Sequence, residues 1–425
     1  MKISNSGSPL WTNNSSSEPS SSTAMAIDNN DNVILNGYDY SDSSSADYIT
    51  VKLSSIGAPV WLRGFASSRE IATGVAVDTN GNVFVTGYST RTSLTNDYDY
   101  VTIMYAANGQ PQWTNFFGGD GNTDDYAIGL ALDGAGNVFV TGSCGIGYAT
   151  IAYTSGGVPL WTNLYPAPGG GGSANAIALN SKGDVFVTGN SAGLGSGDDY
   201  ATVKYSNAGV PLWTNRYNGP GNAMDFANAI AIDNTGNVFV TGYSTGVGSY
   251  YDYATIKYSG DGLPLWTNRY NGPKNGYDYA FGVAVDSSGN AFVNGYSAGL
   301  GPPIDLVTLA YSGSGVALWT NRYATGITSL GPAAAVTVDR AGNVFVTGGD
   351  SDTGDYVAIK YSSSVRTWLS ALRLESNLVL SWTNAGFSLQ AASEPTGVFT
   401  NVLGATSPYT NSIQDSRGFF RLVAP

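Results

Sequence analysis

Apolar and polar residues alternate along most of this chain in short segments that end at Gly, Asn, Asp or Pro. Four such segments follow one another at residues 227–233, 238–243, 253–258 and 264–270. A period of two places successive side chains on opposite faces of an extended strand. Glycine in the first connection supplies the positive φ that a tight hairpin needs. The pattern therefore predicts a unit of four strands.

This unit recurs seven times. Its second segment reads Gly-Asn-Val-Phe-Val-Thr-Gly in the best copy, and the copies begin at Asp31, Gly81, Gly136, Gly183, Gly236, Gly289 and Gly342. A Trp-Thr-Asn type segment also occurs seven times, around Trp11, Trp61, Trp113, Trp161, Trp213, Trp266 and Trp319. Four strands in roughly 50 residues is the size of a propeller blade. We predict an all-β fold, with a seven-bladed β-propeller over residues 1–361.

The phase of the repeat predicts how the propeller closes. Residues 2–11 match residues 204–213, so the chain opens on an outer, fourth strand. The last repeat ends at Tyr361, after its third strand. The N-terminal strand is therefore expected to complete the last blade, which removes two exposed sheet edges.

The repeats resemble the bacterial seven-bladed β-propeller repeat family, known as the SBBP repeat. The resemblance rests on Val-Ala-Val-Asp-x-x-Gly-Asn-x-Phe-Val-x-Gly and Asp-Tyr-x-Thr-x-Lys-Tyr, and it covers residues 1 to about 361. It implies the propeller fold and an extracellular protein. It implies almost nothing about activity, because the roles of family members are mostly undefined.

Residues 366–425 depart from the repeat and predict a small β-sandwich-like module of five or six short strands. About 60 residues without disulfides are marginal as an independent fold, so the module is expected to lean on the propeller. Its Phe-Phe-Arg-Leu segment at 419–422 resembles the C-terminal modules of large secreted Verrucomicrobia-type proteins. That resemblance implies surface display or sorting; a capping appendage without a role of its own is the alternative.

Charge and composition limit the classes of partner that the protein is expected to bind. The net charge is −13 and the pI is near 4.3, which disfavours nucleic acid and anionic lipid as partners. No apolar run of 18 residues is present, so no membrane insertion is expected. The Ser-, Thr- and Asn-rich surface favours an extracellular or cell-surface monomer. Residues 1–4 do not begin a signal peptide, so either a removed export signal or a start inside a longer reading frame is implied.

Two residue types constrain the chemistry. The chain has no histidine, which removes the usual general base, the usual zinc ligand and every Ser-His or Cys-His nucleophile. Cys144 is the single cysteine, so an internal disulfide and a thiolate metal cluster are excluded. We expect Cys144 to fill space at a strand end.

Candidate binding residues follow the fourth segment, in loops that propellers commonly use for binding. The sequence Asn-Arg-Tyr-Asn-Gly-Pro occurs twice and begins a third time, giving Arg216, Tyr217, Asn218, Arg269, Tyr270, Asn271, Arg322 and Tyr323. Exposed Tyr with Arg and Asn suits stacking on sugar faces and hydrogen bonding to hydroxyls. The alternative is packing between blades, with the arginine reaching outward to solvent.

Four acids stand eight residues before the Asp of the first hairpin: Glu70, Asp125, Asp225 and Asp278. They are expected to ring the mouth of the central channel unevenly. The simplest interpretation is solvated charge at loop ends. Such carboxylates could also hold Ca²⁺, the one cofactor considered, or act as acid and base on a glycan.

Together these features favour a secreted or cell-surface binding scaffold over an enzyme. The scaffold would engage a polysaccharide or a protein through the propeller loop face. A carbohydrate-active enzyme using the channel-mouth carboxylates is one alternative. A structural module of a larger envelope protein is the other.

Overall fold

The computed structural model is built from strands. It describes residues 2–4, 8–12, 21–42, 45–65, 70–90, 97–119, 123–298, 304–327, 335–349, 356–362, 370–374, 377–381, 388–392, 398–402, 405–406, 409–412 and 419–423. No helix in these ranges is long and apolar enough to cross a membrane. The chain divides into two compact units, Met1–Val338 with Phe345–Ile359, and Asp339–Val344 with Lys360–Pro425.

The repeat forms an antiparallel four-stranded sheet in chain order, as the fifth copy shows. Its strands are β19 (Asp225–Ile232), β20 (Val238–Thr245), β21 (Tyr251–Tyr258) and β22 (Pro264–Tyr270). The predicted fourth segment coincides with β22. The other three strands begin or end up to two residues outside the predicted segments, where pairing continues into the connections.

Five further four-stranded sheets repeat this order, and we number the six sheets along the chain. The first contains β3 (Ser21–Ile27), β4 (Val33–Asp42), β5 (Ser45–Leu53) and β6 (Pro59–Phe65). The second contains β7 (Glu70–Val77), β8 (Val83–Thr90), β9 (Tyr98–Tyr105) and β10 (Pro111–Phe117). The third contains β11 (Tyr126–Leu132), β12 (Val138–Cys144), β13 (Gly147–Tyr153) and β14 (Pro159–Pro166).

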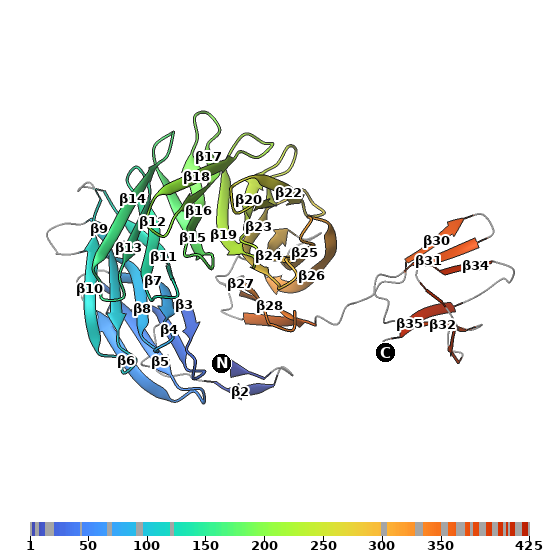
Figure 1. Cartoon of the computed structure of the whole chain (residues 1–425), viewed down its shortest axis with the longest axis horizontal. Coiled ribbons are helices and arrows are strands. Elements are labelled where there is room, and N and C mark those ends of the chain that lie inside the picture. Colours follow the sequence, from blue (N-terminus) through green and yellow to red (C-terminus); the bar gives the residue numbers. More distant parts are fainter. Residues whose placement is uncertain are drawn as a thin grey trace. The chain divides into compact units, whose positions relative to one another are not determined.

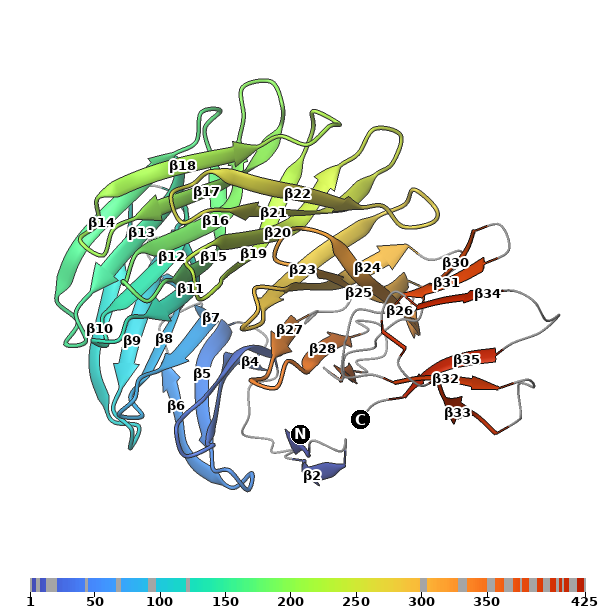
Figure 2. The same cartoon turned by 45° about the vertical axis from the view of Figure 1, so that its right-hand side comes forward.

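The fourth sheet contains β15 (Gly172–Leu179), β16 (Val185–Ala192), β17 (Asp198–Tyr205) and β18 (Pro211–Tyr217). The sixth contains β23 (Asp278–Val285), β24 (Ala291–Ala298), β25 (Ile304–Tyr311) and β26 (Ala317–Ile327). Figure 1 shows the sheets following one another in chain order, and their first strands contact each other from β3 to β23. The fourth strands β10, β14, β18 and β22 lie on the outside (Figure 2).

The ends of the repeat region differ from the six complete sheets. A three-stranded sheet contains β27 (Ala335–Val338), β28 (Val344–Gly349) and β29 (Tyr356–Tyr361). At the N-terminus, β1 (Lys2–Ile3) pairs with β2 (Pro9–Trp11) in a separate hairpin. The described pairings do not join β2 to the three-stranded sheet, so closure by the N-terminal strand and the count of seven blades stay predictions.

Each first hairpin is closed by an Asp and an Asn four residues apart. In the fifth sheet, Asp233 Oδ1 accepts from the backbone N–H of Asn237 at 2.9 Å, and Oδ2 accepts from the Asn237 side chain at 2.8 Å. Gly236 between them has a φ of 85°, which suits glycine. In the fourth sheet the two residue types are exchanged, as Asn180 and Asp184, and still bond at 3.1 Å. The acid in this position therefore stabilises the turn.

Tryptophans on the fourth strands join neighbouring sheets. Trp213 of the fourth sheet donates from Nε1 to the Gly260 carbonyl of the fifth at 3.2 Å. A Cβ on Gly262, in the same turn, would meet the Trp213 ring at 2.9 Å, so glycine lets the ring pack close. Trp61, Trp113, Trp161 and Trp266 make the same bond, and Trp11 of the N-terminal hairpin donates to the Ser55 carbonyl of the first sheet. These tryptophans therefore lie between neighbouring sheets and connect them.

Buried tyrosines on the third strands make a second link. Tyr200 donates to the Ala254 carbonyl of the next sheet at 3.1 Å, and burial raises its pKa well above the ordinary value. Tyr100, Tyr148 and Tyr253 do the same. Their rings and the phenylalanines of the second strands form the largest fully buried side chains of the core. Cys144, the last residue of β12, is buried there, as expected of a space-filling residue.

The second unit contains two three-stranded sheets. One is β30 (Ser370–Leu374), β31 (Asn377–Ser381) and β34 (Tyr409–Ser412); the other is β33 (Thr400–Asn401), β32 (Ser388–Ala392) and β35 (Phe419–Val423). Leu380 of β31 and Leu389 of β32 are each 1% exposed and share one apolar cluster. The two sheets thus have a small common core, while the role expected from the C-terminal resemblance stays a prediction.

Candidate functional site

The four acids predicted at the channel mouth lie at the beginnings of first strands. Glu70, Asp225 and Asp278 are the first residues of β7, β19 and β23, and Asp125 directly precedes β11. Each is at most 1% exposed. The interpretation of these acids as solvated loop-end charges is therefore wrong. For Asp125, Asp225 and Asp278, a backbone N–H of the loop that follows the preceding fourth strand also reaches the carboxylate.

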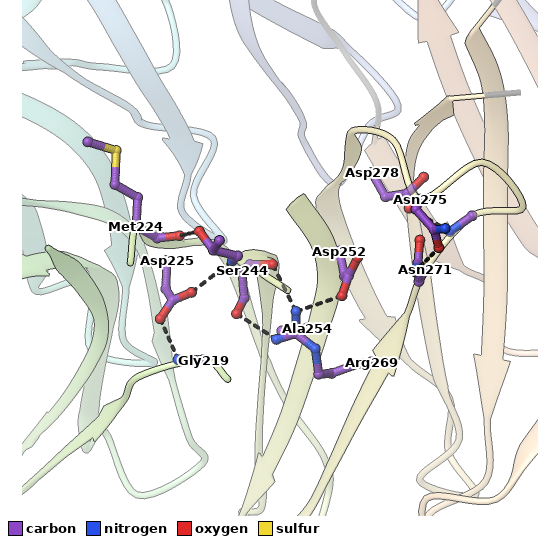
Figure 3. A network of polar contacts seen from close by, with 12 residues as sticks. Gly219, Met224, Asp225, Ser244, Asp252, Ala254, Arg269, Asn271, Asn275 and Asp278 are labelled. Carbon is purple, nitrogen blue, oxygen red and sulfur yellow. Dashed lines mark hydrogen bonds and ion pairs between the residues drawn. The ribbon is translucent and has the colours of Figure 1, made fainter. Parts of the chain in front are cut away.

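Asp225 shows how such an acid fixes the loop above it (Figure 3). Its Oδ2 accepts from the Gly219 backbone N–H at 2.5 Å, and its Oδ1 accepts from the Thr245 backbone N–H at 3.0 Å. Burial raises the pKa of Asp225, and these hydrogen bonds only partly offset the shift. The same loop bond recurs at 2.5 Å from Gly119 to Asp125 and at 2.6 Å from Gly272 to Asp278. These three acids anchor loops.

The three candidate arginines occupy equivalent positions on β18, β22 and β26. In the fifth sheet, Arg269 lies between Ser244 and Asp252 (Figure 3), donating to Ser244 Oγ at 2.6 Å and to Asp252 Oδ2 at 2.8 Å. It also donates to the Tyr217 hydroxyl of the fourth sheet at 2.9 Å. The corresponding partners are Ser191, Asp199 and Tyr165 for Arg216, and Ser297, Asp305 and Tyr270 for Arg322.

These contacts separate the eight candidate binding residues into two groups. The arginines and two tyrosines join strands and sheets to one another; this group is Arg216, Tyr217, Arg269, Tyr270 and Arg322. The side chains of Asn218, Asn271 and Tyr323 are exposed, Tyr323 at 45%. The first group holds the loops in place, and the second is open to a ligand; binding by either stays a prediction.

Two of the loops present asparagine amides in a fixed arrangement. Asn218 donates from Nδ2 to Asn222 Oδ1 at 2.7 Å, and Asn271 donates to Asn275 at 2.8 Å. Asn222 and Asn275 have φ values of 48° and 52°, the left-handed region that asparagine tolerates better than most residues. All four side chains are exposed, so their amide groups are held at the surface without being covered.

A surface of aromatic side chains between the fifth and sixth sheets was missed by the sequence analysis. Tyr243, Tyr251 and Tyr279 have ring centroids 4.9 to 5.7 Å apart. Tyr277 stacks 5.9 Å from Tyr279, and Tyr250 lies 4.6 Å from Tyr277. Tyr250 is 59% exposed and Tyr277 46%. We call these five residues the tyrosine surface.

The tyrosine surface adjoins one of the asparagine loops. The Tyr250 backbone N–H donates to the Asn275 carbonyl at 3.4 Å, which joins the connection between β20 and β21 to the loop between β22 and β23. Lys274, in the same loop, is exposed, as is Met224 beside the Tyr251 hydroxyl. Exposed rings, amides and one ammonium group therefore lie in neighbouring loops of one junction.

A smaller group of the same kind lies between the second and third sheets. Tyr88, Tyr98 and Tyr126 have ring centroids 4.8 to 5.6 Å apart. Asp124 stands where Tyr277 stands in the other junction and accepts from the Tyr126 hydroxyl at 2.9 Å. Burial and this hydrogen bond raise the pKa of Tyr126 to about 12. None of the three tyrosines is exposed as Tyr250 and Tyr277 are.

The sequence carried a signal for the tyrosine surface. At the junction of the fourth and fifth sheets, the positions of Tyr243 and Tyr251 are occupied by Asn190 and Asp198, which bond to each other at 2.8 Å. The tyrosines thus break the symmetry of the repeat. A comparison of the repeats position by position finds them if it includes aromatic residues as well as acids and arginines.

The described ranges bring no three Asp, Glu or Cys side chains together as a group that could hold a metal ion. The oxygens of Asp225 that face the loop accept backbone N–H groups instead. Ca²⁺ binding at the four acids stays a prediction from the sequence alone.

Comparisons with known proteins agree with the fold. The SBBP beta-propeller repeat family matches residues 64–94 and 212–248. No curated protein matches the chain. Sqt1 from Chaetomium thermophilum is 11% identical, with a TM-score of 0.51 over 85% of this chain and 93% of that one.

Two other solved structures are similar in part. A protein from Lactobacillus plantarum is 13% identical over 77% of this chain and 95% of its own, with a TM-score of 0.45. The beta-propeller domain of the Trilobed protease from Pyrococcus furiosus is 8% identical over 81% and 98%, with a TM-score of 0.41. The repeated four-stranded sheets and the two SBBP matches define a β-propeller protein; at these identities the likeness extends to the fold alone.

Proposed function

We propose that this β-propeller is an extracellular binding scaffold that engages a polysaccharide through the tyrosine surface and the adjoining asparagine loop. The observation that carries the proposal is the pair of exposed rings, Tyr250 and Tyr277, whose centroids are 4.6 Å apart. Exposed contiguous aromatic side chains on a soluble protein mark interaction surfaces more often than chance.

The chemistry of the surface fits a neutral, hydroxyl-rich ligand. A tyrosine presents an apolar ring face and a hydroxyl, so it can pack against the C–H face of a sugar and still bond its hydroxyl groups. Asn271 and Asn275 add amide donors and acceptors at the same junction. The net charge of −13 disfavours an anionic polymer and leaves neutral glycans as the better class.

The proposal is tested on a glycan array with the intact protein and the variant Tyr250→Ala/Tyr277→Ala. We expect the variant to lose at least tenfold in binding, because two stacking rings are removed. Leu265→Ala is the matched control, since Leu265 is 46% exposed on the outer strand β22 and takes no part in the surface. Absence of binding by the wild type, or equal binding by the tyrosine variant, contradicts the proposal.

One observation favours a second candidate, a carbohydrate-active enzyme. Burial raises the pKa of Asp225 and Asp278, the direction that a general acid requires, but both side chains are 0% exposed and would reach a glycan only if their loops opened. Release of reducing sugar from a glycan that binds the array, lost in Asp278→Asn but kept in Leu265→Ala, supports the enzyme. Binding without release supports the scaffold. Binding to a protein ligand in place of every glycan contradicts the glycan proposal.

A further inference from the structure

A second feature breaks the repeat at the opposite ends of the strands. The first hairpins and the turns between third and fourth strands lie together there. At that end, a cavity of about 710 Å³ opens between the second and third sheets. Its walls include Asp78, Met104 and Gln112 of the second sheet, and Asp133 and Ser155 of the third.

Equivalent positions in other sheets hold a lysine, and its ammonium group has fixed partners. Lys204 of the fourth sheet lies 2.9 Å from Asp184 and donates to the Gly260 carbonyl of the fifth sheet at 3.0 Å. Its Nζ also stands 5.0 Å from the centroid of the Phe186 ring. A carboxylate, a carbonyl of the next sheet and an aromatic face thus surround one ammonium group.

The fifth sheet repeats this arrangement with different distances. Lys257 lies 3.6 Å from Asp233, donates to the Gly313 carbonyl at 2.9 Å and stands 4.6 Å from the Phe239 ring centroid. Lys52 of the first sheet lies 2.8 Å from Asp28. The site for an ammonium group is therefore a property of the repeat, and these three lysines fill it from within the chain.

In the second sheet the surroundings remain and the lysine is absent. Met104 pairs with Phe84 and Trp113, as Lys204 pairs with Phe186 and Trp213. Asp78 stands where Asp233 stands, and the Ser155 carbonyl accepts from Trp113 Nε1 at 2.9 Å, as the Gly260 carbonyl does from Trp213. The unbranched methionine side chain is one atom shorter than lysine and has no N–H to donate.

No donor from another strand replaces the lysine at Asp78 in the described part of the chain. Its bonds come from its own turn: the Asn80 and Asn82 backbone N–H groups at 2.9 and 2.8 Å, and the Asn82 side chain at 2.7 Å. The third sheet also lacks the lysine, but there Asn207 of the fourth sheet donates to Asp133 at 3.3 Å. The second sheet therefore combines an acid, an acceptor carbonyl and a cavity.

We propose that this cavity binds a primary ammonium group on an aliphatic stem, the chemistry of a lysine side chain. The ammonium group takes the place that Nζ occupies in the fourth and fifth sheets, between Asp78 and the Ser155 carbonyl. The stem lies against Met104 and Trp113, and Asp133 adds negative charge to the opposite wall. The site is independent of the tyrosine surface, because first hairpins and second connections lie at opposite ends of the strands.

The test is a ligand-observed NMR titration with Nα-acetyl-lysine methylamide. The matched probe is Nα-acetyl-norleucine methylamide, which has the same kind of stem without the ammonium group. We expect the lysine probe to bind and the norleucine probe to bind at least tenfold more weakly. Equal binding of the two probes, or no binding of the lysine probe, overturns the proposal.

Three variants locate the binding. Met104→Lys fills the site from within the chain and Asp78→Asn removes the charge, so each should weaken the lysine probe at least tenfold. Leu265→Ala, on β22 and outside the cavity, should bind as the wild type does. An unchanged circular dichroism spectrum confirms that each variant is folded, and unchanged affinity in Met104→Lys overturns the proposal.

A third probe, pentylamine, distinguishes a free alkylamine from a lysine side chain of a polypeptide as the ligand. Equal affinity for pentylamine and the lysine amide identifies a free alkylamine as sufficient. Tighter binding of the lysine amide identifies a lysine within a polypeptide. Both results support the ammonium site, whereas preference for the Nε-acetylated lysine amide contradicts it.

Discussion

The second and fifth sheets share one repeat but hold their neighbours differently. Both keep the neutral links, because Trp113 and Trp266 donate to carbonyls of the following sheets, as do Tyr100 and Tyr253. The fifth sheet adds two charged links, through Arg269 and Lys257. In the second sheet the equivalent positions hold Phe116 and Met104.

The difference shows which contacts the repeat cannot lose. Tryptophan, tyrosine and the Asp-Asn hairpin recur where the charged links do not, so apolar packing and neutral hydrogen bonds assemble the sheets. The charged links are additions that local sequence can replace. Where one is missing, at Met104, a cavity opens and a polar site remains without its lysine.

The largest expected effect follows from removing the arginine link. Arg269→Ala leaves Asp252, 5% exposed, without its cationic partner, and should lower the free energy of unfolding by about 3 kcal/mol. Phe116→Ala at the equivalent position should cost less than about 1 kcal/mol, since that side chain is already exposed. Guanidinium unfolding midpoints compare the two. Equal losses of unfolding free energy in the two variants would contradict the proposed difference between the second and fifth sheets.

A smaller effect should appear in acid. Burial alone would raise the pKa of Asp28, but the hydrogen bonds from Lys52 and Asn32 outweigh it and lower the pKa to about 2. A lowered pKa means that the stabilisation is complete above the unfolded value near 3.8 and is lost as the pH falls through about 2.

The Asp28→Asn variant tests this sign. It should lose about 2 kcal/mol of the stability that the wild type has at pH 6, and the difference should shrink as the pH falls toward 2. Thermal unfolding across this pH range provides the measurement. A difference that grows in acid is inconsistent with the Lys52–Asp28 link.

The smallest expected effect is an increase in stability. Met104→Lys should restore the ammonium link in the second sheet and raise the free energy of unfolding by up to about 1 kcal/mol, since the site is only partly covered. Met104→Leu serves as the control, and urea unfolding midpoints report the change. A loss of stability in Met104→Lys shows that the surroundings of Met104 do not reproduce those of Lys204.

The repeated unit could be predicted from the sequence because its signals are local. The Asp and Asn of each first hairpin are four residues apart, and the alternation in residues 264–270 predicts the outer strand directly. Packing between blades was the alternative expected for the arginines, but their partners could not be predicted, since Arg269 meets Tyr217 of the neighbouring sheet, 52 residues away. Burial of Asp225 depends on the Gly219 N–H turning inward, a direction that the sequence does not record.

The asparagine loops and the tyrosine surface also differ in how far the sequence predicts them. Asn218 and Asn271 were found because they repeat in neighbouring loops. The tyrosine surface needs Tyr243 and Tyr279 from adjacent sheets to meet, and only the fold shows this contact. Residues that differ from their equivalents in the other repeats therefore indicated candidate binding sites better than residues that recur in every repeat.

The most direct test of the account is an affinity comparison of two matched double variants on a glycan that the wild type binds. Tyr250→Ala/Tyr277→Ala alters the exposed rings of the fifth–sixth junction, and Tyr98→Ala/Tyr126→Ala alters the half-buried rings of the second–third junction. Isothermal titration should show at least a tenfold loss for the first variant and less than a twofold change for the second. Equal affinities for the two variants would contradict the assignment of binding to the tyrosine surface.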